Sequence, residues 1–158
     1  MSELTRSLNN IAGAYFVAGE LSQRGHIATV TARNTRGIDV LASKLDGSKS
    51  VSILVRTSSV KERENHTRSW SMGKRDENVF SDYLFYVFVD IKYNNEKPDY
   101  YVVKSKIVAE YVKTTHHEYL SKSGGDGKPH PEGEMRAFVI EDSDVEKFLS
   151  RWDTLGLD

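Results

Sequence analysis

The strongest constraint on the fold is a pair of β-branched segments joined by an Asp-Gly turn. Residues 38–45 and 51–57 have the composition of strands, and Asp46-Gly47 lies between them. Asp-Gly flanked by such segments is the best short-range signal for a β-hairpin. A tight turn also fixes which residues oppose each other, so this hairpin predicts the positions of individual side chains.

The predicted register places a carboxylate and a guanidinium on one face of the sheet. A two-residue turn pairs Leu45 with Ser48, and counting back along both strands sets Asp39 opposite Leu54, with Arg56 on the diagonal. Side chains alternate along a strand, so these last three residues share a face with Ser52. The opposite, apolar face is predicted to carry Ile38, Val40, Ile53 and Val55.

The other elements alternate between helices and strands. An amphipathic helix is expected over residues 4–24, with apolar positions that include Leu4, Leu8, Ile11, Tyr15 and Ala18, and Gly25 is its C-terminal cap. Strands are expected over 27–31, 83–91, 100–103 and 135–140, the second of them central and buried. Residues 58–78 read as a long polar excursion with some helix, and 121–133 as a loop. One helix should begin at a Ser105 cap and another at the capping box formed by Ser143 and Glu146, running to Trp152.

This order of elements predicts an α/β protein with a mixed sheet and helices packed against it. The length of 158 residues suits a single domain over 1–158. The absence of cysteine excludes a disulfide scaffold, a thiolate zinc site and a cysteine nucleophile. The sequence has no apolar segment of roughly 18 residues, and residues 1–10 lack a signal-peptide core, so a cytoplasmic protein without a membrane partner is expected.

Three segments resemble motifs of one enzyme family. Residues 37–41 read GIDVL, residues 52–57 read SILVRT, and residues 12–21 read AGAYFVAGEL. Together they resemble the PD-(D/E)XK nuclease superfamily, which includes restriction enzymes and Holliday-junction resolvases. In that family a helix precedes a hairpin, the first strand carries Asp, and the second carries an acidic residue or Gln, any residue, then Lys. The resemblance implies a restriction-endonuclease-like mixed β-sheet core flanked by helices.

The resemblance also implies a Mg²⁺ site for phosphodiester hydrolysis. Asp39 and the backbone carbonyl of Val55 would be metal ligands, and Arg56 would stand at the Lys position. The helix would contribute either Ala14 or Glu20; the helical wheel places Ala14 at the edge of the apolar stripe and Glu20 on the opposite, solvated side. Leu54 cannot bind a metal, and Arg is a poor proton acceptor, so the ligand set is depleted.

Three interpretations follow. The first is a nuclease-like protein with an eroded metal site and no tightly bound cofactor, which binds nucleic acid with little or no catalysis. The second is an active Mg²⁺-dependent endonuclease, in which Asp39 ligates the metal, Glu20 swings in and Arg56 stabilises the phosphate. The third is a non-enzymatic interaction module that self-associates through Tyr83, Tyr86, Tyr100 and Tyr101. A homodimer is left open.

The charge distribution is compatible with nucleic acid as a partner. Residues 24–75 contain 11 basic and 4 acidic side chains, although the whole chain has a net charge of −1. The alternatives are that these charges are dispersed and solvated, that Trp70 anchors a loop on the sheet, and that Asp39 and Arg56 form no more than an ion pair. The candidate nucleic-acid-binding residues are Arg33, Arg36, Lys61, Arg63, Arg68 and Trp70.

Overall fold

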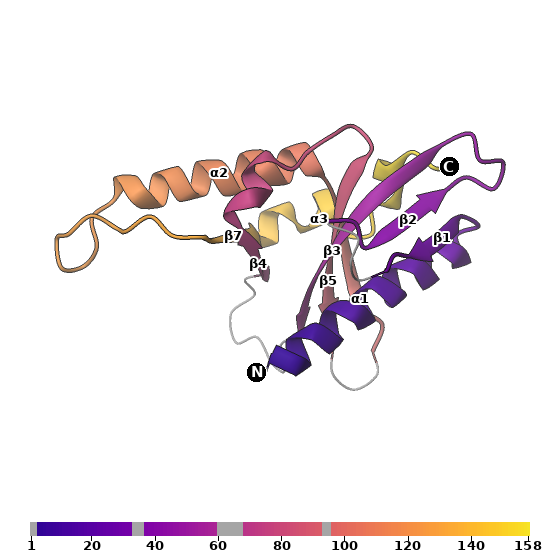
Figure 1. Ribbon diagram of the computed structural model, residues 1–158, viewed down its shortest axis with the longest axis horizontal. Coiled ribbons are helices and arrows are strands. Elements are labelled where there is room, and N and C mark those ends of the chain that lie inside the picture. Colours follow the sequence, from indigo (N-terminus) through magenta and orange to yellow (C-terminus); the bar gives the residue numbers. More distant parts are fainter. Residues whose placement is uncertain (1–2, 33–36, 60–67, 93–95) are drawn as a thin grey trace.

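The computed structural model describes residues 3–32, 37–59, 68–92 and 96–158 (Figure 1). The first part forms α1 (Glu3–Gln23), β1 (Ile27–Val30), β2 (Val40–Ser43) and β3 (Ser50–Ser59). The middle forms β4 (Arg68–Gly73), the 3₁₀ turn η1 (Lys74–Asn78), β5 (Leu84–Ile91) and β6 (Asp99–Lys104). The last part forms α2 (Ser105–Ser121), β7 (Met135–Ile140), η2 (Asp142–Asp144), α3 (Val145–Phe148) and η3 (Trp152–Leu155).

A mixed five-stranded sheet is the centre of the molecule. Its order is β1-β2-β3-β5-β6, with β3 and β5 parallel and the other neighbours antiparallel. Strands β4 and β7 form a separate antiparallel ribbon. The predicted α/β class, with a mixed sheet flanked by helices, is confirmed. Within the described residues, no helix is both long enough and apolar enough to cross a bilayer.

The predicted register of the hairpin is confirmed, although its turn is longer than expected. Val40 pairs with Ile53, and the three following pairs keep the same register. The two strands are closed by a hydrogen bond from the Lys44 N–H to the Lys49 carbonyl (3.0 Å), so four residues, 45–48, form the loop. Gly47 in this loop has a φ of 70°, a left-handed conformation that favours glycine.

Both faces of the central sheet are covered, as a core flanked by helices requires. On one face, α1 and the C-terminal segment cover a first core that includes Val40, Ile53 and Val55. On the other face, α2 and the β4–β7 ribbon cover a second core that includes Leu54, which is only 1% exposed. The hairpin face expected to be polar is therefore largely interior. Beyond the sheets, α2 and the segment returning to β7 extend as an arm (Figure 1).

The helix α1 has the predicted extent, and it packs on the sheet through the side of the predicted apolar stripe that Ala14, Val17 and Leu21 widen. It ends as expected at Gly25, whose φ is 86°, and the His26 N–H donates to the Leu21 carbonyl. The face packed on the sheet carries Ala14, Val17 and Leu21. Two residues placed on the apolar stripe, Leu8 and Tyr15, are instead 56% and 64% exposed. Small and large residues are mixed along this helix. The spacing of its apolar residues is therefore compatible with either of two neighbouring faces packing on the sheet.

Two segments differ from the prediction. In the segment read as a polar excursion, Ser69, Trp70, Ser71 and Met72 alternate between exposed and buried positions as strand β4. The C-terminal helix was expected to reach Trp152, but α3 ends at Phe148. Next to α3, Leu149 forms a β-bridge with Tyr101 of β6. The chain after α3 pairs with the free edge of β6 instead of continuing the helix: the Ser150 N–H donates to the Tyr100 carbonyl.

Two smaller expectations about side chains are also wrong. Ser105 is not a helix cap, since Lys104 occupies that position and the Ser105 hydroxyl donates to the Ser81 carbonyl. Of the four tyrosines assigned to self-association, Tyr86, Tyr100 and Tyr101 are at most 4% exposed and only Tyr83 lies on the surface. The interaction surface built on those tyrosines is therefore not available.

The close approach of α1 to β3 at Gly13 gives a test of the packing. A methyl group at Gly13 would overlap the buried Thr57 hydroxyl and lie 3.3 Å from a methyl of Val55. We expect Gly13→Ala to lower the free energy of unfolding by about 1–3 kcal/mol in urea denaturation. The matched control is Gly19→Ala in the same helix, where nothing lies within 4 Å; it should raise stability by about 0.5–1 kcal/mol. A neutral Gly13→Ala would contradict this packing.

Candidate functional site

The carboxylate of Asp39 is attached to β3 through the backbone. Asp39 lies in a bend just before β2, where its N–H donates to the Ile53 carbonyl at 2.9 Å. Its Oδ2 accepts the N–H of Val55 at 2.7 Å. The side chain remains 41% exposed and is not turned into the apolar interior. Asp39 therefore lies beside the middle of β3, with its side chain partly exposed.

Arg56 lies between two carboxylates. Its Nη1 is 3.8 Å from Asp39 Oδ2, and its Nη2 is 3.4 Å from Oδ1 of Asp76. The same Nη1 donates to the carbonyl of Val55 at 3.1 Å. The guanidinium carbon lies 5.6 Å from the centre of the Tyr86 ring, a cation–π distance. Arg56 thus contacts both acidic groups and the backbone carbonyl at once.

Asp76, which sequence reasoning missed, is the buried member of the site. It is only 3% exposed, and its carboxylate accepts the Tyr86 hydroxyl and the Gly73 N–H, each at 2.7 Å. Burial, together with the hydrogen bond to Asp76, raises the pKa of Tyr86 well above its usual value. The sequence around Asp76 does not indicate that η1 contacts β5. The hydrogen bond between Asp76 and Tyr86 is a tertiary contact, and no sequence motif includes both residues.

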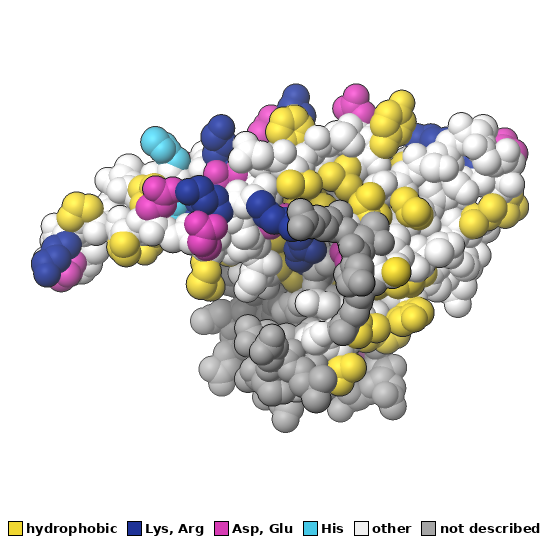
Figure 2. Space-filling view, in the orientation of Figure 1, with side chains coloured by type: hydrophobic (Ala, Val, Ile, Leu, Met, Phe, Trp, Pro, Cys, Tyr) yellow, Lys and Arg dark blue, Asp and Glu magenta, His cyan; other side chains and the backbone are white. Residues whose placement is uncertain are grey.

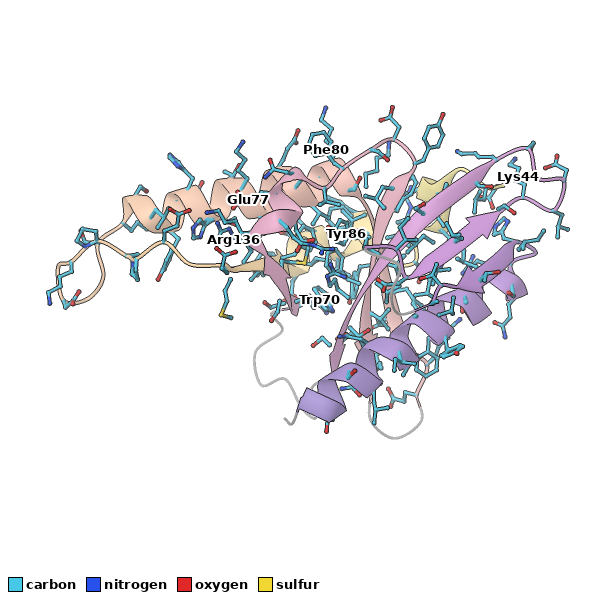
Figure 3. The ribbon with its side chains drawn as sticks, viewed as in Figure 1. Lys44, Trp70, Glu77, Phe80, Tyr86 and Arg136 are labelled. Carbon is cyan, nitrogen blue, oxygen red and sulfur yellow. The ribbon has the colours of Figure 1, made fainter. Side chains whose placement is uncertain are left out.

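The turn η1 is held in place by a second ion pair. Glu77, next to Asp76, accepts the Nε–H of Arg136 in β7 at 2.5 Å. Arg136 also donates to the carbonyls of Gly133 and Met135, so its buried guanidinium is well satisfied. In Figure 3, Glu77 and Arg136 lie close together, and Tyr86 lies on the side of the central sheet. The ribbon therefore fixes the position from which Asp76 reaches Arg56.

The donor set does not fit a Mg²⁺ ion. Mg²⁺ requires near-octahedral oxygen ligands, but the Val55 carbonyl and Asp39 Oδ2 already contact Arg56. Leu54 offers no ligand and points into the second core. Among the described residues, no three His, Cys, Asp or Glu side chains come close enough together to hold a metal ion. The guanidinium supplies the positive charge that a metal would bring.

The structure separates the two helix residues considered for the site. Ala14 lines a surface pocket together with Asp39, so the helix position that faces the hairpin carries no carboxylate. Glu20 lines a different pocket, with Lys97 and Tyr100. Its predicted solvated position is wrong: Glu20 is 7% exposed and pairs with Lys97 and Arg24, each at 2.9 Å. Burial acts to raise the pKa of Glu20, but these two partners outweigh it and lower the pKa.

The structure describes two of the six residues proposed for nucleic-acid binding. Trp70 is 2% exposed, packs on Phe88 and Tyr101, and donates its indole N–H to the Val89 carbonyl, so its assignment as a base-stacking residue is wrong. Figure 3 shows it in the interior. Arg68 pairs with Asp142 at 2.7 Å and donates to the Tyr101 hydroxyl. The other four, Arg33, Arg36, Lys61 and Arg63, lie outside the described residues.

Comparison with known proteins identifies a similar solved structure. No family model matches the chain, and no curated protein matches it. Among solved structures, the chain is similar to Hjc, a Holliday junction resolvase from the archaeal hyperthermophile Archaeoglobus fulgidus. The two share 10% identity with a TM-score of 0.49, over 94% of this chain and 97% of that one. At this identity, the likeness does not say which side chains this chain uses.

The different burial of the two carboxylates predicts different costs of removing them. Asp76→Ala leaves the Tyr86 hydroxyl, the Gly73 N–H and part of the Arg56 charge without a partner, and should lower the free energy of unfolding by about 2–4 kcal/mol. Asp39→Ala removes an exposed carboxylate and should cost about 1 kcal/mol. Urea denaturation of both variants measures the difference. Equal losses would contradict the assignment of Asp76 as the main anchor of Arg56.

Proposed function

We propose that this chain is a nuclease-like protein with an eroded metal site, which binds nucleic acid with little or no phosphodiester hydrolysis. The observation that carries the proposal is the position of Arg56 between Asp39 and Asp76, on the carbonyl of Val55. The family resemblance of the hairpin assigns two of these groups, Asp39 and Val55, to the metal.

The chemistry of the guanidinium supports loss of hydrolysis. Hydrolysis at a metal site needs a Lewis acid and a group that accepts a proton from water. A guanidinium stays protonated in proteins, so Arg56 cannot serve as that acceptor. Its single positive charge offsets part of the negative charge of Asp39 and Asp76, which lowers the attraction of these carboxylates for a divalent cation. What the arrangement retains is a positively charged group, 24% exposed, at the end of a hairpin.

Magnesium binding tests the eroded site. In titration calorimetry, the wild-type protein should give no saturable heat with millimolar Mg²⁺, because Arg56 holds the available oxygens. The comparison variant is Ala14→Glu with Arg56→Lys, which adds a carboxylate to the pocket that contains Asp39; it should bind Mg²⁺ if its circular dichroism spectrum shows that it is folded.

Cleavage provides an independent measurement that does not depend on that variant. Wild-type protein and Asp39→Asn should both leave single-stranded, duplex and branched DNA intact in Mg²⁺ or Mn²⁺. Metal-dependent cleavage by the wild type that Asp39→Asn abolishes would overturn the proposal in favour of an active endonuclease.

Salt dependence tests the nucleic-acid partner. The logarithm of the affinity for duplex DNA should fall linearly with the logarithm of salt concentration and be unchanged by EDTA. Arg33→Ala with Arg36→Ala should weaken binding and reduce the slope by about 0.9 for each phosphate that the protein no longer neutralises. Lys122→Ala with Lys128→Ala, on the arm, is the matched control and should leave both quantities unchanged. Absence of any salt-dependent affinity would contradict a nucleic-acid partner.

A further inference from the structure

Next to the site lies a second pocket with a different chemical character. It has a volume of about 490 Å³, and its lining includes Gly37, Ile38, Ser52, Arg75, Ser81 and Tyr83; we call it the Arg75 pocket. Ile38 also lines the pocket that contains Asp39, so the two pockets adjoin. On the face seen in Figure 2, apolar side chains and Lys or Arg side chains lie next to each other between η1 and β3.

Arg75 brings a positive charge to this pocket. Within the part of the chain that the structure describes, no carboxylate lies within ion-pair distance of its guanidinium; the nearby Asp76 is used by Arg56, and Glu77 by Arg136. The Arg75 guanidinium passes close to Gly37: a Cβ at that residue would lie 3.4 Å from Nη2. A guanidinium presents several N–H donors in one plane, which suits it to a phosphate group.

Tyr83 supplies an aromatic surface at the same pocket. It is 63% exposed, although the strand that follows it is almost entirely buried. Its backbone is fixed, because the Tyr83 carbonyl accepts the Ser52 N–H at 2.8 Å. Ser81 is also fixed, since its N–H donates to the Ser105 hydroxyl of α2 and its carbonyl accepts from the same hydroxyl, each at 3.1 Å. The pocket is therefore rigid on two of its sides before any ligand binds.

From this combination we infer that the Arg75 pocket binds one unpaired nucleotide of a single-stranded nucleic acid. The base would stack on Tyr83, the phosphate would contact Arg75, and the hydroxyls of Ser52 and Ser81 would be available to base edges. Every base has an aromatic face, so stacking of this kind tolerates any sequence. A base paired within a duplex cannot reach Tyr83 in this way. This inference rests on the proposed function. It adds that the protein prefers single-stranded to duplex nucleic acid.

Two variants separate stacking from charge. Fluorescence anisotropy measures binding to a labelled oligothymidine and to a blunt duplex of the same length. Tyr83→Ala should weaken single-strand binding about 5- to 100-fold, leave duplex binding unchanged and keep the salt slope, whereas Tyr83→Phe should retain affinity. Arg75→Ala should reduce the single-strand salt slope by about 0.7. The controls are Tyr119→Ala, where the tyrosine is 45% exposed on α2, and Lys128→Ala.

Each result decides between the two proposals. If the wild type binds no nucleic acid, the proposed function and the pocket fail together. If it binds nucleic acid but Tyr83→Ala and Arg75→Ala have no effect, or weaken duplex and single strand equally, only the pocket assignment is overturned. Competition with thymidine monophosphate is a further test. If this nucleotide displaces the labelled strand at equal nucleotide concentration, the pocket binds a free nucleotide, and its assignment to a strand is overturned.

Discussion

The molecule depends on the pairing of β3 with β2 on one side and with β5 on the other. These two ladders hold a ten-residue strand in the middle of the sheet, and its alternation sends Val55 into one core and Leu54 into the other. Both cores would lose their alignment if the register shifted by one residue. The same strand carries Arg56 and the Val55 carbonyl, so the pairing that aligns the two cores also sets the positions of these two groups of the site.

The side chains of the site form one connected network of hydrogen bonds and ion pairs. Asp39 accepts a backbone N–H, Arg56 bridges two carboxylates, and Asp76 accepts a hydroxyl and an N–H from two further elements. Such a network fixes the relative positions of the hairpin, η1 and β5. Polar groups satisfied in this way stabilise one arrangement of the chain.

Local and short-range features of this fold could be read from the sequence. The hairpin register, the end of α1 at Gly25 and the strand over 135–140 follow from turn chemistry and alternation between neighbours. The contacts that were missed join distant segments. The alternation of Ser69 to Met72 is typical of a strand, but the charged residues around it obscured the pattern. The sequence near Asp76 does not indicate its ion pair with Arg56, and the sequence near Glu20 does not indicate its ion pair with Lys97.

The hydrogen bond from Val55 to Asp39 gives one carboxylate a structural role that does not depend on any activity. It holds the backbone of β3 in either case, so its removal has a small cost in stability even in a chain that catalyses nothing. An aspartate at this point of a hairpin is therefore weak evidence that a chain is an enzyme. The side chains near it on β3 and α1 are more informative.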